Sequence, residues 1–193
     1  HCISSAASDV YKRQVLDEAL HLWLAGHATD AWVRPVVAFT QLGNVAWMVS
    51  LSAAVLALLL WRRDWLHAAA WVVATAGVGL WIRAIKTSVG RPRPVGGWVP
   101  EGGFSFPSGH SAGTFVLYLM LAWLLLPYLR PAWRWPVGLA ALAVALGVGA
   151  SRVVLRVHYA SDVLAGWLLG LAWMALVICA VEWAQTRVAG RRC

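Results

Sequence analysis

The chain has 193 residues, of which 61% are apolar and only 12% are charged, and 14 of them are tryptophan. A soluble domain of this size carries about twice that charged fraction, so the composition argues against a soluble helical protein. The net charge of +8 would suggest a nucleic-acid partner in a soluble protein. The positions of the basic residues, described below, favour a membrane instead, and we expect no nucleic-acid partner.

The first fourteen residues, HCISSAASDVYKRQ, are polar and begin without methionine, and the composition changes abruptly at Val15. They lack the central apolar stretch of a signal peptide. We interpret residues 1–14 as a non-native, adapter-derived segment, and a genuine disordered tail is the alternative. Residues 15–193 then form a single domain that is truncated at its amino terminus.

Residues 15–43 place apolar residues at helical spacing, which predicts an amphipathic helix at the membrane interface. A turn or kink is expected at Pro35 and a break at Gly43. Four titratable side chains are interspersed, namely Asp17, Glu18, His21 and His27. We expect the two histidines to lie at a surface rather than to act as ligands.

Five later segments are long and apolar enough to cross a bilayer, which takes about 20 helical residues. Each has a core without Asp, Glu, Lys or Arg, and several segment ends carry tryptophan, as in an aromatic belt. The sequence therefore predicts an all-α, polytopic membrane bundle. The five spans are 44–61, 65–86, 109–129, 134–151 and 160–184.

The basic residues divide between the two sides of such a bundle. With alternating spans, three arginine clusters fall on one side, which the positive-inside rule makes cytoplasmic. They lie at residues 62–63, 130–134 and 187–192. The remaining cations concentrate on the opposite side, at 83–93 and 152–156. Positive charge there contradicts the rule and needs another explanation.

Three polar stretches lie on that opposite side and can converge although they are far apart in sequence. They are KTSVGRPRP (86–94), PSGH (107–110) and SRVVLRVHYASD (151–162). Their cations suit phosphate oxygens, and the free N–H groups of a helix starting near Gly109 favour an anion. The candidate phosphate-binding residues are Lys86, Arg93, Ser108, Gly109 and Arg152.

Two histidines complete the constellation. His158 and Asp162 share a helical face at i, i+4, so Asp162 can orient one imidazole nitrogen and leave the other as a nucleophile. His110 can protonate a leaving group and then activate water. Taken singly, PSGH could be a turn, Arg152 an interfacial anchor and His158–Asp162 a structural pair. Their shared side of the membrane and their fit to one ligand favour the catalytic interpretation.

These segments, Lys86-x6-Arg93-Pro94, Pro107-Ser108-Gly109-His110 and Ser151-Arg152-x5-His158-x3-Asp162, resemble the signature of the type 2 phosphatidic acid phosphatase (PAP2) family. The resemblance implies a helical membrane bundle of the PAP2/haloperoxidase type with six spans, so the first span is expected to be missing here. It also implies removal of phosphate through a phosphohistidine, without metal or cofactor. His158 would be the nucleophile, Asp162 its orienting group, and His110 the acid and base.

The resemblance places the active site on the extracytoplasmic side, here of a bacterial cytoplasmic membrane. Candidate substrates are undecaprenyl pyrophosphate, phosphatidylglycerol phosphate and phosphatidic acid. Alternatives are vanadate-dependent haloperoxidase-like chemistry and a non-catalytic phospholipid-binding or transport protein. A metal phosphatase is disfavoured because few carboxylates lie near the motifs. The sequence leaves the oligomeric state open. We expect Glu101 to be solvated and Gly166–Gly170 to pack helices. We expect Arg91 and Arg156 to be solvated or interfacial anchors, and the alternative is that they add to the positive field of the site or contact the head group.

Overall fold

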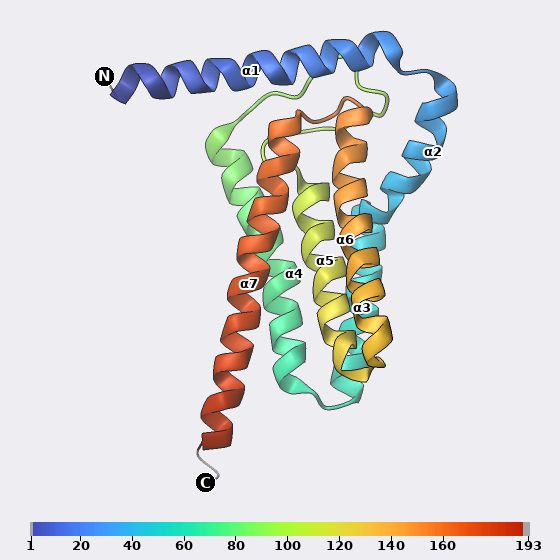
Figure 1. Cartoon of the computed structure of the whole chain (residues 1–193), viewed down its shortest axis with the longest axis vertical. Coiled ribbons are helices and arrows are strands. Elements are labelled where there is room, and N and C mark those ends of the chain that lie inside the picture. Colours follow the sequence, from blue (N-terminus) through green and yellow to red (C-terminus); the bar gives the residue numbers. More distant parts are fainter. Residues whose placement is uncertain (1, 191–193) are drawn as a thin grey trace.

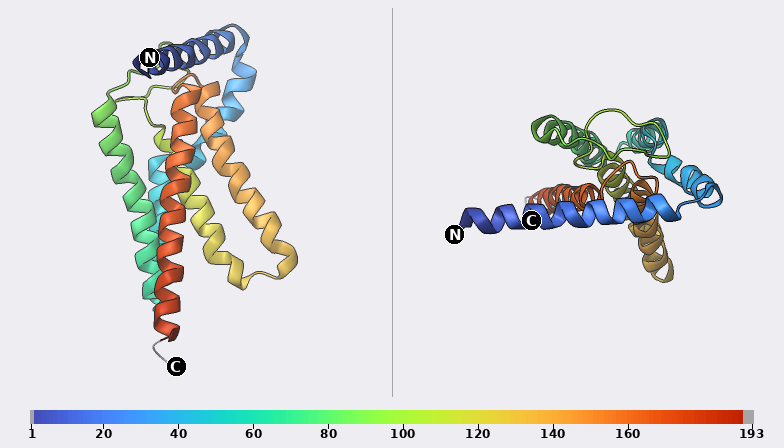
Figure 2. Two further views of the ribbon diagram at one scale, coloured as in Figure 1. Left: turned by 60° about the vertical axis from the view of Figure 1, so that its left-hand side comes forward. Right: turned by 90° about the horizontal axis from the view of Figure 1, so that it is seen from above.

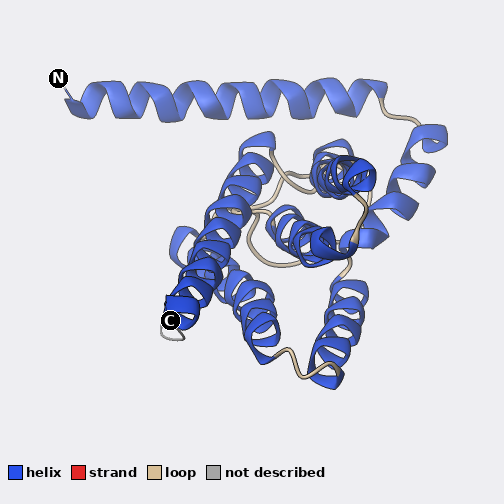
Figure 3. Ribbon diagram, turned by 60° about the horizontal axis from the view of Figure 1, so that its bottom comes forward, coloured by secondary structure: helices blue, strands red, loops and turns tan. Residues whose placement is uncertain are grey.

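Figure 1 shows the computed structural model of the chain, which describes residues 2–190, with side chains for 15–29 and 31–187. Residues 2–190 form helices joined by loops and contain no strand (Figure 3). The elements are α1 (Cys2–His27), α2 (Asp30–Thr40), η1 (Gln41–Gly43), α3 (Val45–Trp61), α4 (Trp65–Val89), α5 (Gly109–Leu125), η2 (Leu126–Tyr128), α6 (Pro131–Val154) and α7 (Ala160–Gly190).

Five helical segments are long and apolar enough to cross a membrane, which confirms the five predicted spans, although the first begins at Ala31 rather than at residue 44. They are Ala31–Trp61, Trp65–Val89, Gly109–Tyr128, Pro131–Val154 and Ala160–Arg187. A sixth span is not among the described residues. Instead, α1 lies across one end of the bundle, beside the end of α7 when seen from above (Figure 2). The backbone of α1 runs without a break through the compositional boundary at Val15.

Local signals in the sequence set several helix boundaries. Asn44 begins α3, where its side chain accepts a hydrogen bond from the Ala46 N–H, and Asp64 does the same for α4 through the His67 N–H. Gly90 ends α4 at φ 63°, a conformation that glycine adopts without strain. Of the turn or kink expected at Pro35, the turn is wrong, because α2 continues through this residue. The break predicted at Gly43 is confirmed by η1.

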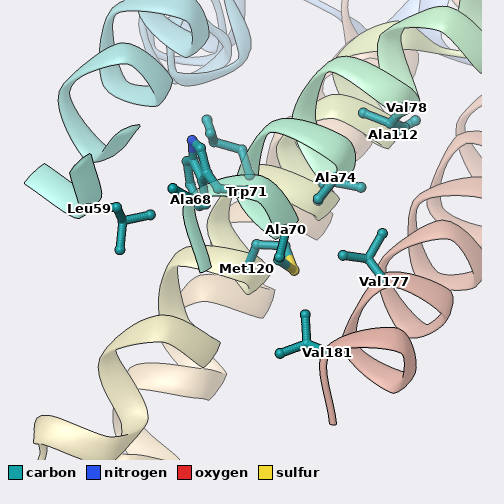
Figure 4. Close-up of a cluster of buried hydrophobic side chains, with 12 residues drawn as sticks. Leu59, Ala68, Ala70, Trp71, Ala74, Val78, Ala112, Met120, Val177 and Val181 are labelled. Atoms are coloured by element: carbon teal, nitrogen blue, oxygen red, sulfur yellow. The ribbon is translucent and has the colours of Figure 1, made fainter. Parts of the chain in front are cut away.

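Helix α5 is the centre of the bundle and packs against α4, α6 and α7. Figure 4 shows the main core cluster, in which Trp71, Ala74 and Met120 are fully buried. Alanines at several of these positions let the helix backbones approach closely, which is how helices associate in a membrane. The outer face of α7, by contrast, exposes Leu164 and Leu168. An exposed leucine face on a spanning helix is suited to lipid, as expected of an integral membrane protein.

The two ends of the bundle carry different residues. The α3–α4 and α5–α6 connections and the carboxyl end of α7 lie at one end, and α1 and the α4–α5 and α6–α7 loops lie at the other (Figure 1). The first end holds the arginine clusters at 62–63 and 130–134, beside exposed Trp61, Trp65 and Trp135. The second end holds the three motif segments. The alternation of spans therefore sorts the residues as predicted.

Candidate active site

The three motif segments meet at the α1 end of the bundle and face a cavity of about 620 Å³. A second cavity of about 430 Å³ lies between η1, Arg152 and the α4–α5 loop. Glu101 and His110 line both cavities, so the two meet at these side chains. The predicted site residues that line the larger cavity are Lys86, Arg93, Gly109, His110 and His158.

His158 and Asp162 form the predicted pair. The Nδ1 atom of His158 faces Asp162 Oδ2 at 3.5 Å and has no other partner in the part of the chain that the structure describes. This separation is longer than a formed hydrogen bond, and such contacts often tighten when substrate binds. Asp162 Oδ2 also accepts the Tyr159 N–H at 3.0 Å. The carboxylate therefore lies where it can hold a proton on Nδ1.

The other imidazole nitrogen points towards the cations. Arg93 Nη1 lies 3.1 Å from His158 Nε2 and donates to the Val157 carbonyl at 3.0 Å. Burial lowers the pKa of His158 below its ordinary value, because the charged imidazolium loses its hydration. A neutral ring with its proton on Nδ1 leaves a lone pair on Nε2. Nε2 is therefore the nucleophilic atom that this geometry offers.

The three predicted cations are held by backbone and side-chain acceptors around the cavities. Lys86 Nζ donates to the Phe104 carbonyl, and Arg93 donates to the Gly102 carbonyl at 3.0 Å. Arg152, which is 2% exposed, donates to Thr40 Oγ1 at 3.2 Å. It lines the second cavity rather than the first. The guanidinium groups are thus fixed in place before any ligand binds.

Glu101 is partly exposed, as the sequence analysis expected, but it is also ion-paired within the site, which the sequence analysis did not predict. Its carboxylate pairs with Arg152 and lies 3.8 Å from Arg93 Nη2. Burial alone would raise the pKa of Glu101, but the charges of Arg152, His110 and Arg93 outweigh it and lower the pKa below its ordinary value. An ionised carboxylate therefore sits between two arginines where we expect phosphate oxygens. A bound phosphate has to compete with it.

The PSGH segment forms the predicted cap of α5. Ser108 begins the helix and is fully buried, and its Oγ accepts from Ser111 Oγ at 2.9 Å. The structure does not bring this hydroxyl to either cavity. Gly109 does line the larger cavity, and a Cβ there would meet only Ile82 at 3.7 Å, an ordinary contact. The neighbouring protein atoms therefore do not require glycine at 109.

The expectation that Gly166 and Gly170 pack helices agrees with their position between α7 and α5. A Cβ at Gly166 would lie 2.7 Å from the Ser108 carbonyl oxygen, and one at Gly170 would lie 3.0 Å from Phe115 Cβ. In addition, the Ser108 N–H donates to the Asp162 carbonyl at 3.0 Å. These contacts fix the start of α5, which carries His110, against the start of α7, which carries Asp162.

Sequence reasoning missed Arg91. Its Nη1 atom donates to Asp162 Oδ1 at 2.7 Å and its Nη2 atom to Asp17 Oδ2 at 2.9 Å. Its guanidinium also lies 4.2 Å from the centre of the Tyr159 ring, within range of a cation–π contact. The sequence held one signal: Asp162, at the start of an apolar span, needed a cationic partner if it was buried.

The fold and the site together define a polytopic helical membrane protein with a histidine, carboxylate and cation constellation at one end of the bundle. Residues 65–186 match the sequence model of the PAP2 superfamily. The chain belongs to this superfamily, as its motifs indicated.

Individual relatives agree with this assignment. The chain is 40% identical over 99 residues to phosphatidylglycerophosphatase B of Bacillus subtilis, covering 49% of this chain and 48% of that protein. It is 34% identical over 110 residues to a lipid A 1-phosphatase of Rhizobium johnstonii, covering 51% and 41%. It is 35% identical over 81 residues to an undecaprenyl-diphosphatase of Sulfolobus acidocaldarius, covering 41% and 34%. These alignments span about half or less of each relative.

Two solved structures share the fold. The crystal structure of a transmembrane PAP2-type phosphatidylglycerolphosphate phosphatase from Bacillus subtilis superposes with a TM-score of 0.83 at 30% identity, covering 94% of this chain and 92% of that one. The structure of LpxE from Aquifex aeolicus superposes with a TM-score of 0.67 at 20% identity, covering 84% and 94%. The second likeness concerns the fold alone.

Proposed function

We propose that this chain is a membrane phosphatase that removes phosphate from a lipid monophosphate or pyrophosphate through a phosphohistidine, without a metal ion. One observation carries the proposal. Two histidines and two cations face a single cavity that continues as an apolar groove into the membrane-spanning part of the bundle.

The apolar groove runs between α3 and α4. Beyond Lys86 and His158, the cavity is lined by Met48, Val49 and Leu56 of α3 and by Val78 and Ile82 of α4. Val45 to Leu56 spans about 16 Å along the helix axis at 1.5 Å per residue. This arrangement suits a substrate whose phosphate meets the cations while its hydrocarbon chain stays within the membrane.

In the first step, His158 Nε2 attacks the phosphorus and the bond from phosphorus to the lipid oxygen breaks. His110, protonated, gives its proton to the departing oxygen, so that the lipid leaves as an alcohol, or as a lipid monophosphate when the substrate is a pyrophosphate. Lys86, Arg93, Arg152 and the N–H groups at the start of α5 stabilise the charge on the phosphoryl oxygens. The phosphate displaces Glu101 from the arginines.

In the second step, water attacks the phosphorus and the bond from phosphorus to Nε2 breaks. His110, now neutral, takes a proton from that water. Inorganic phosphate leaves, and His158 returns to its starting state with Asp162 holding the Nδ1 proton. Every proton transfer is assigned to a residue of the chain.

The relatives support a lipid phosphate as the substrate class, because their names specify phosphatidylglycerophosphate, lipid A and undecaprenyl diphosphate. The arginine clusters at the opposite end of the bundle support an active site on the extracytoplasmic face of a bacterial cytoplasmic membrane. The test is phosphate release by the purified chain in detergent with EDTA, on phosphatidic acid, phosphatidylglycerol phosphate and undecaprenyl pyrophosphate. Release from at least one lipid is expected, and release from none would overturn the proposal.

A further inference from the structure

Arg91 joins the site to the amino-terminal helix. One of its nitrogens holds Asp162 and the other holds Asp17 of α1, and the same guanidinium donates to Ser161 Oγ at 2.7 Å. Arg91 does not line either cavity. Its contacts therefore concern the orientation of Asp162 rather than the substrate.

Asp17 is built into this end of the bundle although it lies on a helix crossing its outside. Its side chain is only 6% exposed. One oxygen accepts the Ser161 N–H at 3.1 Å, and the other accepts from Ser161 Oγ and from Arg91. A buried carboxylate is costly unless it is paired and hydrogen-bonded. These contacts come from Arg91 in the α4–α5 loop and from Ser161 in the first turn of α7.

A second side chain of α1 makes a similar connection one turn further on. His21 Nε2 lies 3.1 Å from the Val95 carbonyl and 2.8 Å from Arg156 Nη2. Val95 belongs to the α4–α5 loop and Arg156 to the α6–α7 loop. Helix α1 therefore contacts both motif loops at two successive turns, through Asp17 and His21, while Leu16, Leu22 and Trp23 remain exposed.

The carboxylate of Asp162 needs its plane fixed to serve His158. Arg91 holds Oδ1 at 2.7 Å and the Tyr159 N–H holds Oδ2 at 3.0 Å, so the group cannot rotate freely away from His158 Nδ1. Arg91 in turn has a long side chain with several rotamers, and Asp17 fixes its other nitrogen. Asp17 thus restricts the rotation of Arg91, and Arg91 in turn restricts the rotation of Asp162.

We propose that Asp17 and Arg91 are positioning residues of the His158–Asp162 pair, through which docking of α1 holds the nucleophile in its working orientation. The inference rests on the proposed phosphatase function. Neither residue is a catalytic residue, because neither reaches the cavity in which the phosphate would bind.

The test measures kcat and KM for phosphate release from a short-chain phosphatidic acid by the full chain in detergent, together with the inhibition constant of inorganic phosphate. We expect Arg91→Gln and Asp17→Asn each to lower kcat about 10- to 100-fold and to change KM and phosphate inhibition less than about threefold, since the phosphate-binding groups remain. Asp17→Glu should recover part of the lost rate. Glu18→Gln, an exposed neighbour on the same helix, should behave as the unchanged chain does.

A double variant carrying Arg91→Gln and Asp17→Asn shows whether the two residues act through one shared role or independently. If Asp17 acts through Arg91, the double variant should lose no more kcat than Arg91→Gln alone. A multiplied loss, a rise in KM that accounts for the whole effect, or unchanged rates in an active chain would each overturn the inference. A misfolded fraction would lower the apparent kcat without changing the inhibition constant, so kcat is referred to the folded chain, measured by size-exclusion chromatography and by Tm in detergent. A chain without any phosphatase activity would overturn the proposed function and this inference together.

Discussion

The contact between α5 and α7 and the space between α3 and α4 are built in opposite ways. At Gly166 of α7 an added Cβ would lie 2.7 Å from a backbone oxygen of the α5 cap, whereas at Gly79 of α4 it would meet nothing within 4 Å. The first contact fixes His110 and Asp162 relative to each other. The second region leaves room along the membrane-spanning part of α4. The candidate catalytic residues thus lie on closely packed helices, α5 and α7. The hydrocarbon chain of the substrate is proposed to lie in the open groove between α3 and α4.

The largest expected effect concerns Asp162, which the close contact between α5 and α7 positions. Asp162→Asn replaces an acceptor facing His158 Nδ1 with an amide that can donate, which favours the wrong tautomer of the imidazole. By analogy with the aspartate of serine-protease triads, kcat for phosphate release should fall about 10³- to 10⁴-fold. Glu182→Gln, an exposed acid on the same helix, serves as the control. A loss below about tenfold would contradict the orienting role.

Gly166→Ala tests the tight contact itself. Its new methyl group would press on the Ser108 carbonyl and on Ser111 Cβ, and overpacking of this kind costs about 1–3 kcal/mol. We expect a lower Tm in detergent. The matched control is Gly138→Ala on α6, where a Cβ meets nothing within 4 Å and helix propensity favours alanine. Equal Tm values for the two variants would show that the α5–α7 contact yields easily.

Gly79→Leu tests the open groove between α3 and α4. A Cβ at position 79 would meet no atom within 4 Å, and Gly79 lines the groove with Ile82, so we expect a leucine side chain to fill part of the groove. The KM for a long-chain lipid phosphate should rise about tenfold, which corresponds to about 1.4 kcal/mol, while a short water-soluble phosphate ester should be hydrolysed as before. Gly138→Leu, outside the cavity, is the control. An equal effect on both substrates would contradict the proposal that the groove binds the hydrocarbon chain.

The smallest effect is a displacement on the pH axis. The neutral imidazole of His158 is the proposed nucleophile, so kcat/KM falls as the pH drops through its pKa. Burial lowers that pKa, so the acid limb should lie below about pH 6.5, the ordinary value for histidine. The measurement is a kcat/KM profile across the acid range. An acid limb well above pH 6.5 would mean that another group controls it.

The sequence was sufficient for the spans and for the convergence of the motifs, because charge-free helices and alternating crossings place Lys86, His110 and His158 at one end without any knowledge of side-chain contacts. It was not sufficient for Glu101 or Arg91. Both lie in the α4–α5 loop, whose path depends on contacts with α1 and with the α6–α7 loop. No periodic pattern specifies such contacts. The same reason hid Asp17, whose partners are 74 and 144 residues away.

The central claim is that His158 becomes phosphorylated, and one measurement addresses it directly. The chain is incubated in EDTA with a lipid carrying ³²P in its terminal phosphate, quenched in alkali and examined for protein-bound label. We predict an alkali-stable, acid-labile phosphohistidine that is absent from His158→Ala, together with loss of phosphate release in that variant. Label of the same kind on the His158→Ala chain, or full phosphate release by it, would contradict the account.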